Sequence, residues 1–331
     1  MLDLASVQAG AEEDLLGMAN VQGVALGHKV KDGQETKEPA ISVLVSHKVD
    51  PALLSSENRV PKSIKNVKTD VVEVGEIFAG DQSPGNASEE TEADAGIQAA
   101  PFSPGLRRRL RPARGGFSVS LAHQGGTGTI ATGCYDLTPF PSKPSAYYIL
   151  SNNHVLANSN AAPIGSAVIQ PGRVDGGVFP RDFIGKLRRF IPIRFISGGN
   201  APCNYVDAAI AECNLQDLDR DPFWGGPVKT LYTAPKVGDI VQKAGRTTGF
   251  TTGRVTAINA TVNVNYGGGR VARFCRQIVT SDMSAPGDSG SLVTNLDEGA
   301  VGLLFAGSSV ATIINNIAFV QLLLRVRITE K

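Results

Sequence analysis

The residues of this sequence best suited to chemistry are a serine and its glycine neighbours. Residues 285–291 read Ala-Pro-Gly-Asp-Ser-Gly-Ser, with Ser289 between Asp288 and Gly290. Glycine permits unusual backbone angles and the close approach of a substrate. The amides of Gly287 and Ser289 are then placed to stabilise the anion that forms when a hydroxyl attacks a carbonyl group. On its own, the motif is equally compatible with an ordinary β-turn.

A serine hydroxyl also needs a base, because it is a weak nucleophile until its proton is taken. The chain has four histidines, namely His28, His47, His123 and His154. We favour His154, because it follows the apolar run 147–150 and therefore stands at the end of a buried strand. The other three lie at exposed strand ends or beside a Gln-Gly-Gly hairpin tip, and we interpret them as structural.

The third group required is a carboxylate that fixes the tautomer and orientation of the imidazole. Asp207 lies in the apolar run Tyr-Val-Asp-Ala-Ala-Ile-Ala at 205–211. A buried carboxylate without a partner is costly, so we expect Asp207 to have a specific one, the ring of His154. Asp175 and Asp182 stand among glycines and prolines, and we interpret them as turn residues.

The elements that must position these groups fall into three parts. Residues 1–79 alternate helix and strand signals and predict a small α+β module. Residues 80–115 are rich in Ser, Glu, Gly, Asp and Pro and predict a flexible linker. The linker ends in a cluster of arginines at Arg107, Arg108, Arg109, Arg111 and Arg114. A patch for nucleic acid or an acidic partner is one interpretation of the cluster. A solvated basic face is the one we favour, because no aromatic residues are interleaved.

Residues 116–331 are almost entirely short apolar or β-branched runs separated by glycine and proline. The predicted strands are 117–122, 127–135, 147–150, 167–170, 206–211, 240–243, 253–265, 271–279, 291–294 and 301–305. This pattern is typical of an all-β sandwich or barrel. Residues 318–326 predict a closing helix, with a final strand as the open alternative.

Composition narrows the class of protein. The chain has 331 residues, 42% of them hydrophobic, and a net charge of +1, so it favours neither nucleic acid nor an anionic membrane. No run approaches the ~20 apolar residues that cross a bilayer. Acidic residues occupy the start, where a signal peptide is basic and then apolar. We therefore expect a cytoplasmic protein.

The cysteines and histidines point to no bound metal. The four cysteines (Cys134, Cys203, Cys213 and Cys275) are widely spaced, and we interpret them as free, mostly buried thiols of a reducing compartment. They are not at ligand spacing with the histidines, and no nucleotide fingerprint is present. We expect neither a metal nor a cofactor.

Taken together, these motifs resemble a known family. The order His, Asp, Ser, the strand-end histidine, the Asp-Ala-Ala-Ile run and Gly-Asp-Ser-Gly are similar to the trypsin/chymotrypsin-like serine proteases over roughly 116–331. Ser-Asn-Asn-His at 151–154 and Gly-Arg-Thr-Thr-Gly-Phe-Thr-Thr-Gly at 245–253 resemble the cytosolic bacterial and plant members. The resemblance implies a mainly β fold, a chymotrypsin-like double β-barrel with its site in the cleft between the barrels, preceded here by the small α+β module.

The same resemblance implies a function and its residues. His154, Asp207 and Ser289 match the catalytic triad, and the amides of Gly287 and Ser289 match the oxyanion hole. The implied activity is that of a serine endopeptidase, a hydrolase that cleaves a protein or peptide substrate through an acyl-enzyme and needs no cofactor. A catalytically quiet peptide-binding module on the same fold is the alternative, against which the intact triad argues.

One departure from the family concerns activation. In secreted relatives a processed apolar N-terminus inserts beside the residue before the serine, here Asp288. No apolar activation sequence follows the arginine cluster, because Arg114 is followed by two glycines. We therefore do not expect activation by that route. Cleavage near 107–114, including self-cleavage, and a regulatory partner that acts through the N-terminal module are the alternatives left open.

The resemblance also implies a primary specificity pocket. Met283 stands six residues before the nucleophile, where the pocket floor is expected. Phe305, Ala306 and Gly307 would form a wall that pairs with an extended substrate by strand addition. With no carboxylate at the floor, an apolar residue is favoured before the scissile bond. Asp282 reverses this preference if the alignment slips by one position.

Overall fold

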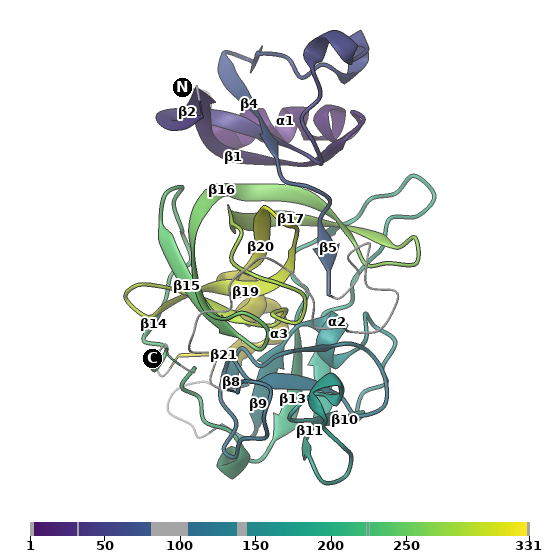
Figure 1. Ribbon diagram of the computed structural model, residues 1–331, viewed down its shortest axis with the longest axis vertical. Helices are drawn as coiled ribbons and strands as arrows, with labels where there is room; N and C mark the ends of the chain where they lie inside the picture. Colours follow the sequence, from purple (N-terminus) through teal and green to yellow (C-terminus); the bar gives the residue numbers. More distant parts are fainter. Residues whose placement is uncertain are drawn as a thin grey trace.

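The computed structural model describes residues 3–31, 33–80, 105–137, 144–222, 224 and 226–329. The described part is mainly β, and its named strands form two sheets of 13 and 8 strands. Figure 1 shows a small N-terminal module above two β-barrels, which confirms the predicted fold class. Most of the predicted linker, 81–104, lies outside the described residues.

The N-terminal module is one helix packed on a small sheet. Its elements are α1 (Leu4–Leu16), β1 (Val21–Lys31), β2 (Gln34–Val45), β3 (Ser63–Ile64) and β4 (Val67–Glu73), with single turns of 3-10 helix at Pro51–Leu53 and Ser56–Asn58. The helix begins at Leu4 because Asp3 caps it, and Val7, Ala11 and Leu15 bury one face at helical spacing. β1 and β2 form a hairpin, and β4 lies parallel to β2.

The first barrel is the 8-stranded sheet. Its strands are β6 (Ser118–Leu121), β7 (Thr127–Thr129), β8 (Thr132–Asp136), β9 (Tyr147–Ser151), β10 (Ala167–Ile169), β11 (Phe183–Phe190), β13 (Ala209–Cys213) and β21 (Val326–Arg327), and the short helix α2 (Asn153–Leu156) follows β9. The order β21-β8-β9-β13-β11-β10-β6-β7 places β9 beside β13. The ends of these two strands therefore lie together.

The second barrel belongs to the 13-stranded sheet. Its strands are β5 (Phe78–Ala79), β12 (Cys203–Asn204), β14 (Thr230–Leu231), β15 (Ile240–Gly245), β16 (Gly249–Asn265), β17 (Val271–Ser281), β18 (Leu292–Asn295), β19 (Gly299–Gly307) and β20 (Ala311–Asn316). The predicted closing helix is α3 (Ile317–Leu324), capped by Asn316 and packed under this barrel. The last two residues of the predicted helix are not helical. The chain turns at Arg325, and Val326 begins β21.

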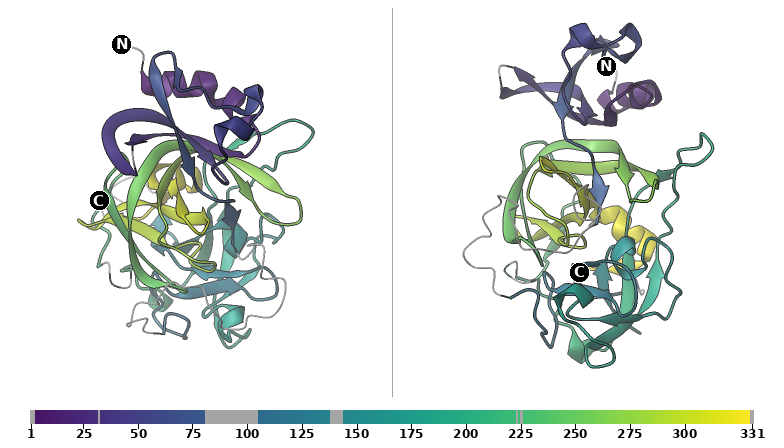
Figure 2. Two further views of the ribbon diagram at one scale, coloured as in Figure 1. Left: turned by 45° about the horizontal axis from the view of Figure 1, so that its top comes forward. Right: turned by 45° about the vertical axis from the view of Figure 1, so that its right-hand side comes forward.

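The sheet of the N-terminal module continues into the second barrel. β1 pairs antiparallel with β16, with Gly23 opposite Val262 and Gly27 opposite Ala257. Gly23 allows this approach, because a Cβ there would lie 2.7 Å from the Thr261 carbonyl. Figure 2 shows the purple hairpin lying along the green arc of β16 in both further views. Backbone hydrogen bonds thus join the module to the barrel that carries Ser289.

The prediction of four free thiols was wrong for two of them. β12 runs parallel to β17, with Cys203 opposite Arg273, and a disulfide joins Cys203 to Cys275 across a Cα–Cα distance of 5.7 Å. The two lie 72 residues apart, so their spacing carried no signal of the pair. Cys134 and Cys213 are free, and burial raises the pKa of the Cys213 thiol to about 12.

The arginine cluster is only partly a solvated face. Arg107, Arg108 and Arg109 are exposed, as expected. Arg111 instead donates to Gln170, at 2.5 Å from its side-chain oxygen, and burial lowers the pKa of its guanidinium. Arg114 pairs with Asp219 at 2.5 Å. These two arginines fasten the segment 105–114 to the first barrel. Among the helices of the described ranges, none is long and apolar enough to cross a membrane.

A buried glutamine, Gln8, links the N-terminal module to β16 of the second barrel, and its substitution tests that attachment. Gln8 on α1 is fully buried, and its amide donates to the carbonyls of Val24 at 3.2 Å and Asn259 at 2.8 Å. Gln8→Ala leaves these acceptors without their donor, so we expect a loss of about 1–3 kcal/mol in the free energy of unfolding. Urea denaturation measures it. The exposed Gln34→Ala is the control, and equal stabilities of the two variants would contradict the role of Gln8.

Candidate active site

His154 and Asp207 meet just beyond the ends of two paired strands. β9 pairs antiparallel with β13, with Ser151 opposite Ala209, so the end of β9 and the start of β13 lie together. His154 Nδ1 lies 2.6 Å from Asp207 Oδ2, and the His154 amide donates to Oδ1 at 3.1 Å. Asn152 donates to the Asp207 carbonyl at 2.7 Å and ties the two segments together. The imidazole is thus held in one orientation with Nε2 directed away from the carboxylate.

Tyr266, at the end of β16, adds a second side-chain donor to Asp207. Its hydroxyl donates to Asp207 Oδ2 at 2.7 Å, and its ring contacts the His154 ring edge-on at 6.2 Å. Burial, followed by the negative charge of Asp207, raises the pKa of Tyr266 well above its ordinary value. The phenol therefore stays a neutral donor. Sequence reasoning missed it, because a tyrosine before three glycines reads as a turn.

The Ser289 loop is attached to the first barrel from the opposite side. The Thr129 amide donates to the Ser289 carbonyl at 2.8 Å, and Thr129 Oγ1 donates to the Gly287 carbonyl at 2.9 Å. Gly128 makes room for the loop, since a Cβ there would meet both Val155 and the Ser289 carbonyl. Ser289 therefore lies at the boundary of the two barrels, near the helix that carries His154.

The triad is only partly assembled in this structure. Asp207 and His154 are joined, but no hydrogen bond is found between Ser289 Oγ and His154 Nε2. The Nε2 atom is buried and has no partner within the described part of the chain. Ser289 is 6% exposed. The predicted residues are thus brought to one place without the last contact that proton transfer requires.

Two amides of the Ser289 loop are left available. The amides of Asp288, Gly290 and Ser291 donate to the carbonyls of Ala285, Leu304 and Asp288. No such bond engages the amides of Gly287 and Ser289 within the described residues. Gly287 has φ +95°, and a Cβ there would clash with Arg246 and Thr247. The geometry therefore leaves two free donors beside the serine, as an anion-binding pair requires.

Asp288 is held by a buried cation. Its carboxylate accepts from Lys243 Nζ at 3.0 Å, from Thr248 Oγ1 at 2.6 Å and from the Thr247 amide at 2.9 Å. Both charged side chains are fully buried. Burial lowers the pKa of Lys243, and the charge of Asp288 opposes that shift. Residues 245–253, which the sequence singled out only for their family resemblance, thus supply part of the anchor for the serine loop.

Asp175 is another residue whose role was underestimated. It was predicted as a turn residue, but its carboxylate accepts two hydrogen bonds from Arg246, at 2.8 and 2.6 Å, and one from Ser118 at 2.5 Å. The Asp175 and Arg246 side chains are 3% and 6% exposed. This pair joins the first barrel to the loop that contacts Gly287.

The predicted pocket residues divide into two groups. Met283 is 4% exposed and lines a cavity of about 290 Å³ together with Asp282 and Phe250. Burial raises the pKa of Asp282. Phe305 instead points into the core and packs on Phe274 at 4.6 Å. Ala306 and Gly307 present their backbone to β5.

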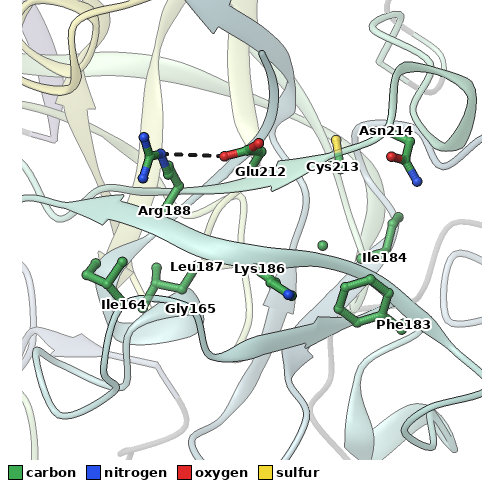
Figure 3. A pocket seen from close by; sticks show the side chains of 11 residues that line it. Ile164, Gly165, Phe183, Ile184, Lys186, Leu187, Arg188, Glu212, Cys213 and Asn214 are labelled. Carbon is green, nitrogen blue, oxygen red and sulfur yellow. Dashed lines mark ion pairs between the residues drawn. The ribbon is translucent and has the colours of Figure 1, made fainter.

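A further hollow lies on the first barrel, away from these groups. Figure 3 shows it over β11 and β13, lined by Ile164, Phe183 and Lys186 among others, with Arg188 paired to Glu212. Its volume is about 310 Å³. None of its lining residues belongs to the predicted site.

The Lys243–Asp288 pair yields a stability test. Lys243→Ala leaves a buried carboxylate without its cation, so we expect a loss of about 3–5 kcal/mol in the free energy of unfolding. The matched control is Lys229→Ala, which removes an exposed partner of Glu298 and should cost ~1 kcal/mol or less. Urea unfolding measures both variants. A loss no larger than the control's would show that the buried pair does not hold the loop.

Comparison with known proteins finds similarity both for the N-terminal module and for a longer stretch of the chain. The family described as NARROW LEAF 1 N-terminal domain matches residues 1–74. The chain is 31% identical over 170 residues to Glutamyl endopeptidase 2 of Streptomyces griseus, covering 50% of this chain and 72% of that protein. It is 47% identical over 73 residues to Serine protease 2 of Streptomyces fradiae, covering 22% of this chain but only 33% of the relative.

Solved structures are similar over about two thirds of the chain. Protease A of Thermobifida fusca has a TM-score of 0.43 at 14% identity, covering 65% of this chain and 96% of that one. A serine protease specific for glutamic acid, described as using a histidine triad in substrate binding, also has a TM-score of 0.43, at 22% identity, covering 64% of this chain and 97% of that one.

Proposed function

Because the chain belongs to the trypsin/chymotrypsin-like serine proteases, we propose that it is a serine endopeptidase whose triad is His154, Asp207 and Ser289. The observation that carries the proposal is the contact of 2.6 Å between His154 Nδ1 and the fully buried Asp207 carboxylate. A buried carboxylate in that position stabilises the imidazolium that forms when histidine accepts a proton.

The proposed reaction uses only side chains and backbone of this chain. Ser289 Oγ attacks the peptide carbonyl while His154 Nε2 takes its proton, and the amides of Gly287 and Ser289 bind the oxyanion. His154 returns the proton to the leaving amine, so the C–N bond breaks and an acyl-enzyme remains. Water then attacks the ester with His154 as base, which releases the acid and restores Ser289.

A catalytically quiet peptide-binding module is the second candidate. The observation that favours it is the absence of a hydrogen bond between Ser289 and His154 Nε2 in this structure. Catalytic hydrogen bonds are often long in unliganded enzymes and tighten only in the complex, so the endopeptidase stays our choice. Reactivity of Ser289 separates the two candidates.

The first experiment is labelling with a fluorophosphonate, which reacts with an activated serine. We expect the parent protein to gain the mass of one adduct and Ser289→Ala to gain none. Intact mass spectrometry measures both. Ser291→Ala is the matched control, because Ser291 is the neighbouring buried serine and its hydroxyl donates to the Asp288 carbonyl instead. Equal labelling of parent and Ser289→Ala would refute Ser289 as the nucleophile.

Tyr266 enters the proposal as a positioning residue. Tyr266→Phe removes one of the donors that satisfy the Asp207 carboxylate, so the carboxylate holds the His154 ring less firmly in its orientation. We expect the rate of fluorophosphonate labelling to fall about tenfold, since a hydrogen bond to a charged group contributes ~1.5–3 kcal/mol.

Urea unfolding distinguishes positioning from a structural role. Tyr205→Phe is the control, because Tyr205 is 38% exposed and makes no hydrogen bond through its hydroxyl among the described residues. A Tyr266→Phe variant that loses labelling only together with its free energy of unfolding would mean that the hydroxyl only supports the fold.

The substrate is proposed to be a protein or peptide with an apolar residue before the scissile bond. Met283 supports this preference, because its thioether fills the cavity beside Gly253. The glutamyl preference named for the Streptomyces griseus relative is not proposed here, since Asp282 lines the same cavity and would repel a glutamate. Hydrolysis of peptide libraries would overturn the proposal if acidic residues were preferred.

The N-terminal module is proposed to receive a regulatory partner, and residues 80–115 to serve as a linker or processing region. The cytoplasmic location stays a prediction. The Cys203–Cys275 disulfide bears against it, because disulfides are rare in reducing compartments. Cell fractionation with thiol mapping would decide between the two.

A further inference from the structure

The chain places one of its own strands where a substrate is expected. β5 pairs antiparallel with β19, with Ala79 opposite Ala306 and Phe78 opposite Gly307. Ala306 and Gly307 are two of the three wall residues predicted to pair with an extended substrate. Figure 1 shows β5 descending from the N-terminal module along the second barrel and pointing toward α2, the helix that begins beside His154. The strand therefore runs from the module toward the catalytic base.

We propose that β5 and Gly80 occupy the substrate site of this protease and keep it closed until the N-terminal module is displaced. The proposal rests on the function proposed above. Strand addition uses backbone donors and acceptors of the sheet edge, and an edge accepts one strand at a time. A substrate can pair with Ala306 and Gly307 only after β5 has left.

Gly80 continues the obstruction from β19, where β5 pairs with Ala306 and Gly307, to His154. It has φ +70°, and a Cβ built on it would lie 3.3 Å from His154 Cδ2 and 3.6 Å from Nε2. The His154 side chain is only 9% exposed. The backbone of residue 80 thus lies beside the Cδ2–Nε2 edge of the ring, which must reach Ser289 and the substrate, and Nε2 has no partner among the described residues.

The strand is held by packing as well as by pairing. Ile77 and Ala79 are 1% and 2% exposed and belong to the core cluster of the second barrel, which includes Phe305. On the other side, the amide of Asn265 donates to the Ile77 carbonyl at 2.9 Å. β5 therefore lies between β16 and β19, with each of its edges hydrogen-bonded. Burial and hydrogen bonds on both edges therefore fix the position of β5.

The path of the chain links the block to the module. The Val74 amide donates to the Val45 carbonyl of β2 at 2.8 Å, and Ser308 Oγ donates to the Val74 carbonyl. Only residues 75–77 separate this attachment from β5. A partner that moves the sheet of the module therefore pulls directly on the strand in the substrate site. This provides a physical route from a regulatory surface to His154.

Dislodging β5 in the full chain tests the proposal. Ala79→Trp cannot be accommodated at a fully packed position, and overpacking should release a two-residue strand before it distorts the barrel. Ala79→Pro removes a strand amide by an independent route. Leu53→Trp is the matched control, because Leu53 is 80% exposed on the module. Hydrogen exchange of the peptide 76–80 reports release, and circular dichroism reports folding.

The readout is the rate at which Ser289 reacts with the fluorophosphonate. We expect at least a tenfold increase for both Ala79 variants, and the parent rate for Leu53→Trp. A folded variant with rapid exchange at 76–80 but the parent rate would overturn the proposal and leave the endopeptidase assignment intact.

If neither the parent nor any variant reacts with the fluorophosphonate, peptide binding tests the proposal instead. If no variant is labelled, the proposed function fails, and the occupancy of the site is tested with a fluorescent peptide, acetyl-Ile-Phe-Ala-Gly-amide. Binding to Ala79→Trp but not to the parent would support occupancy by β5. Equal binding to both, or binding to neither, would overturn it.

Discussion

The arrangement of the site depends on the hydrogen bonds accepted by the Asp207 carboxylate. A fully buried charge is tolerated only when its oxygens are satisfied, and here the donors come from both barrels. His154 contributes its amide and its ring from the first barrel, and Tyr266 contributes its hydroxyl from the second. The need to satisfy one carboxylate thus fixes the orientation of the imidazole and, with it, the relative position of the two barrels at the site.

Asp288 repeats the same physical solution on the other side of the serine. Its donors are Lys243, the two threonines that follow Arg246 and the amide of Ala285. The first three lie on β15 and the turn to β16. The loop that presents Ser289 is therefore anchored within the chain as it stands. Under the closure by β5 proposed above, the step that is controlled is access to the edge of β19.

The barrels could be predicted from the sequence, and three candidate site residues could be named, because their signals are local. Short strands between glycines, a histidine after an apolar run and Gly-Asp-Ser-Gly each occupy a few consecutive residues. Three features were missed, namely the Tyr266 contact, the Lys243–Asp288 pair and the Cys203–Cys275 disulfide. Each joins residues far apart in the chain, and their chemistry is visible only when the strands are assembled. β5 was also missed, because two residues carry no periodicity.

The continuity of the sheet between the module and the second barrel has a consequence for any shortened form of this protease. Residues 257–262 of β16 are paired on one side with β17 and on the other with β1. A chain that began at residue 116 would keep His154, Asp207 and Ser289 but leave the backbone donors and acceptors of that second side without β1. A bare edge of this kind is a template for pairing with another copy. Removal of the module would therefore open a site for self-association.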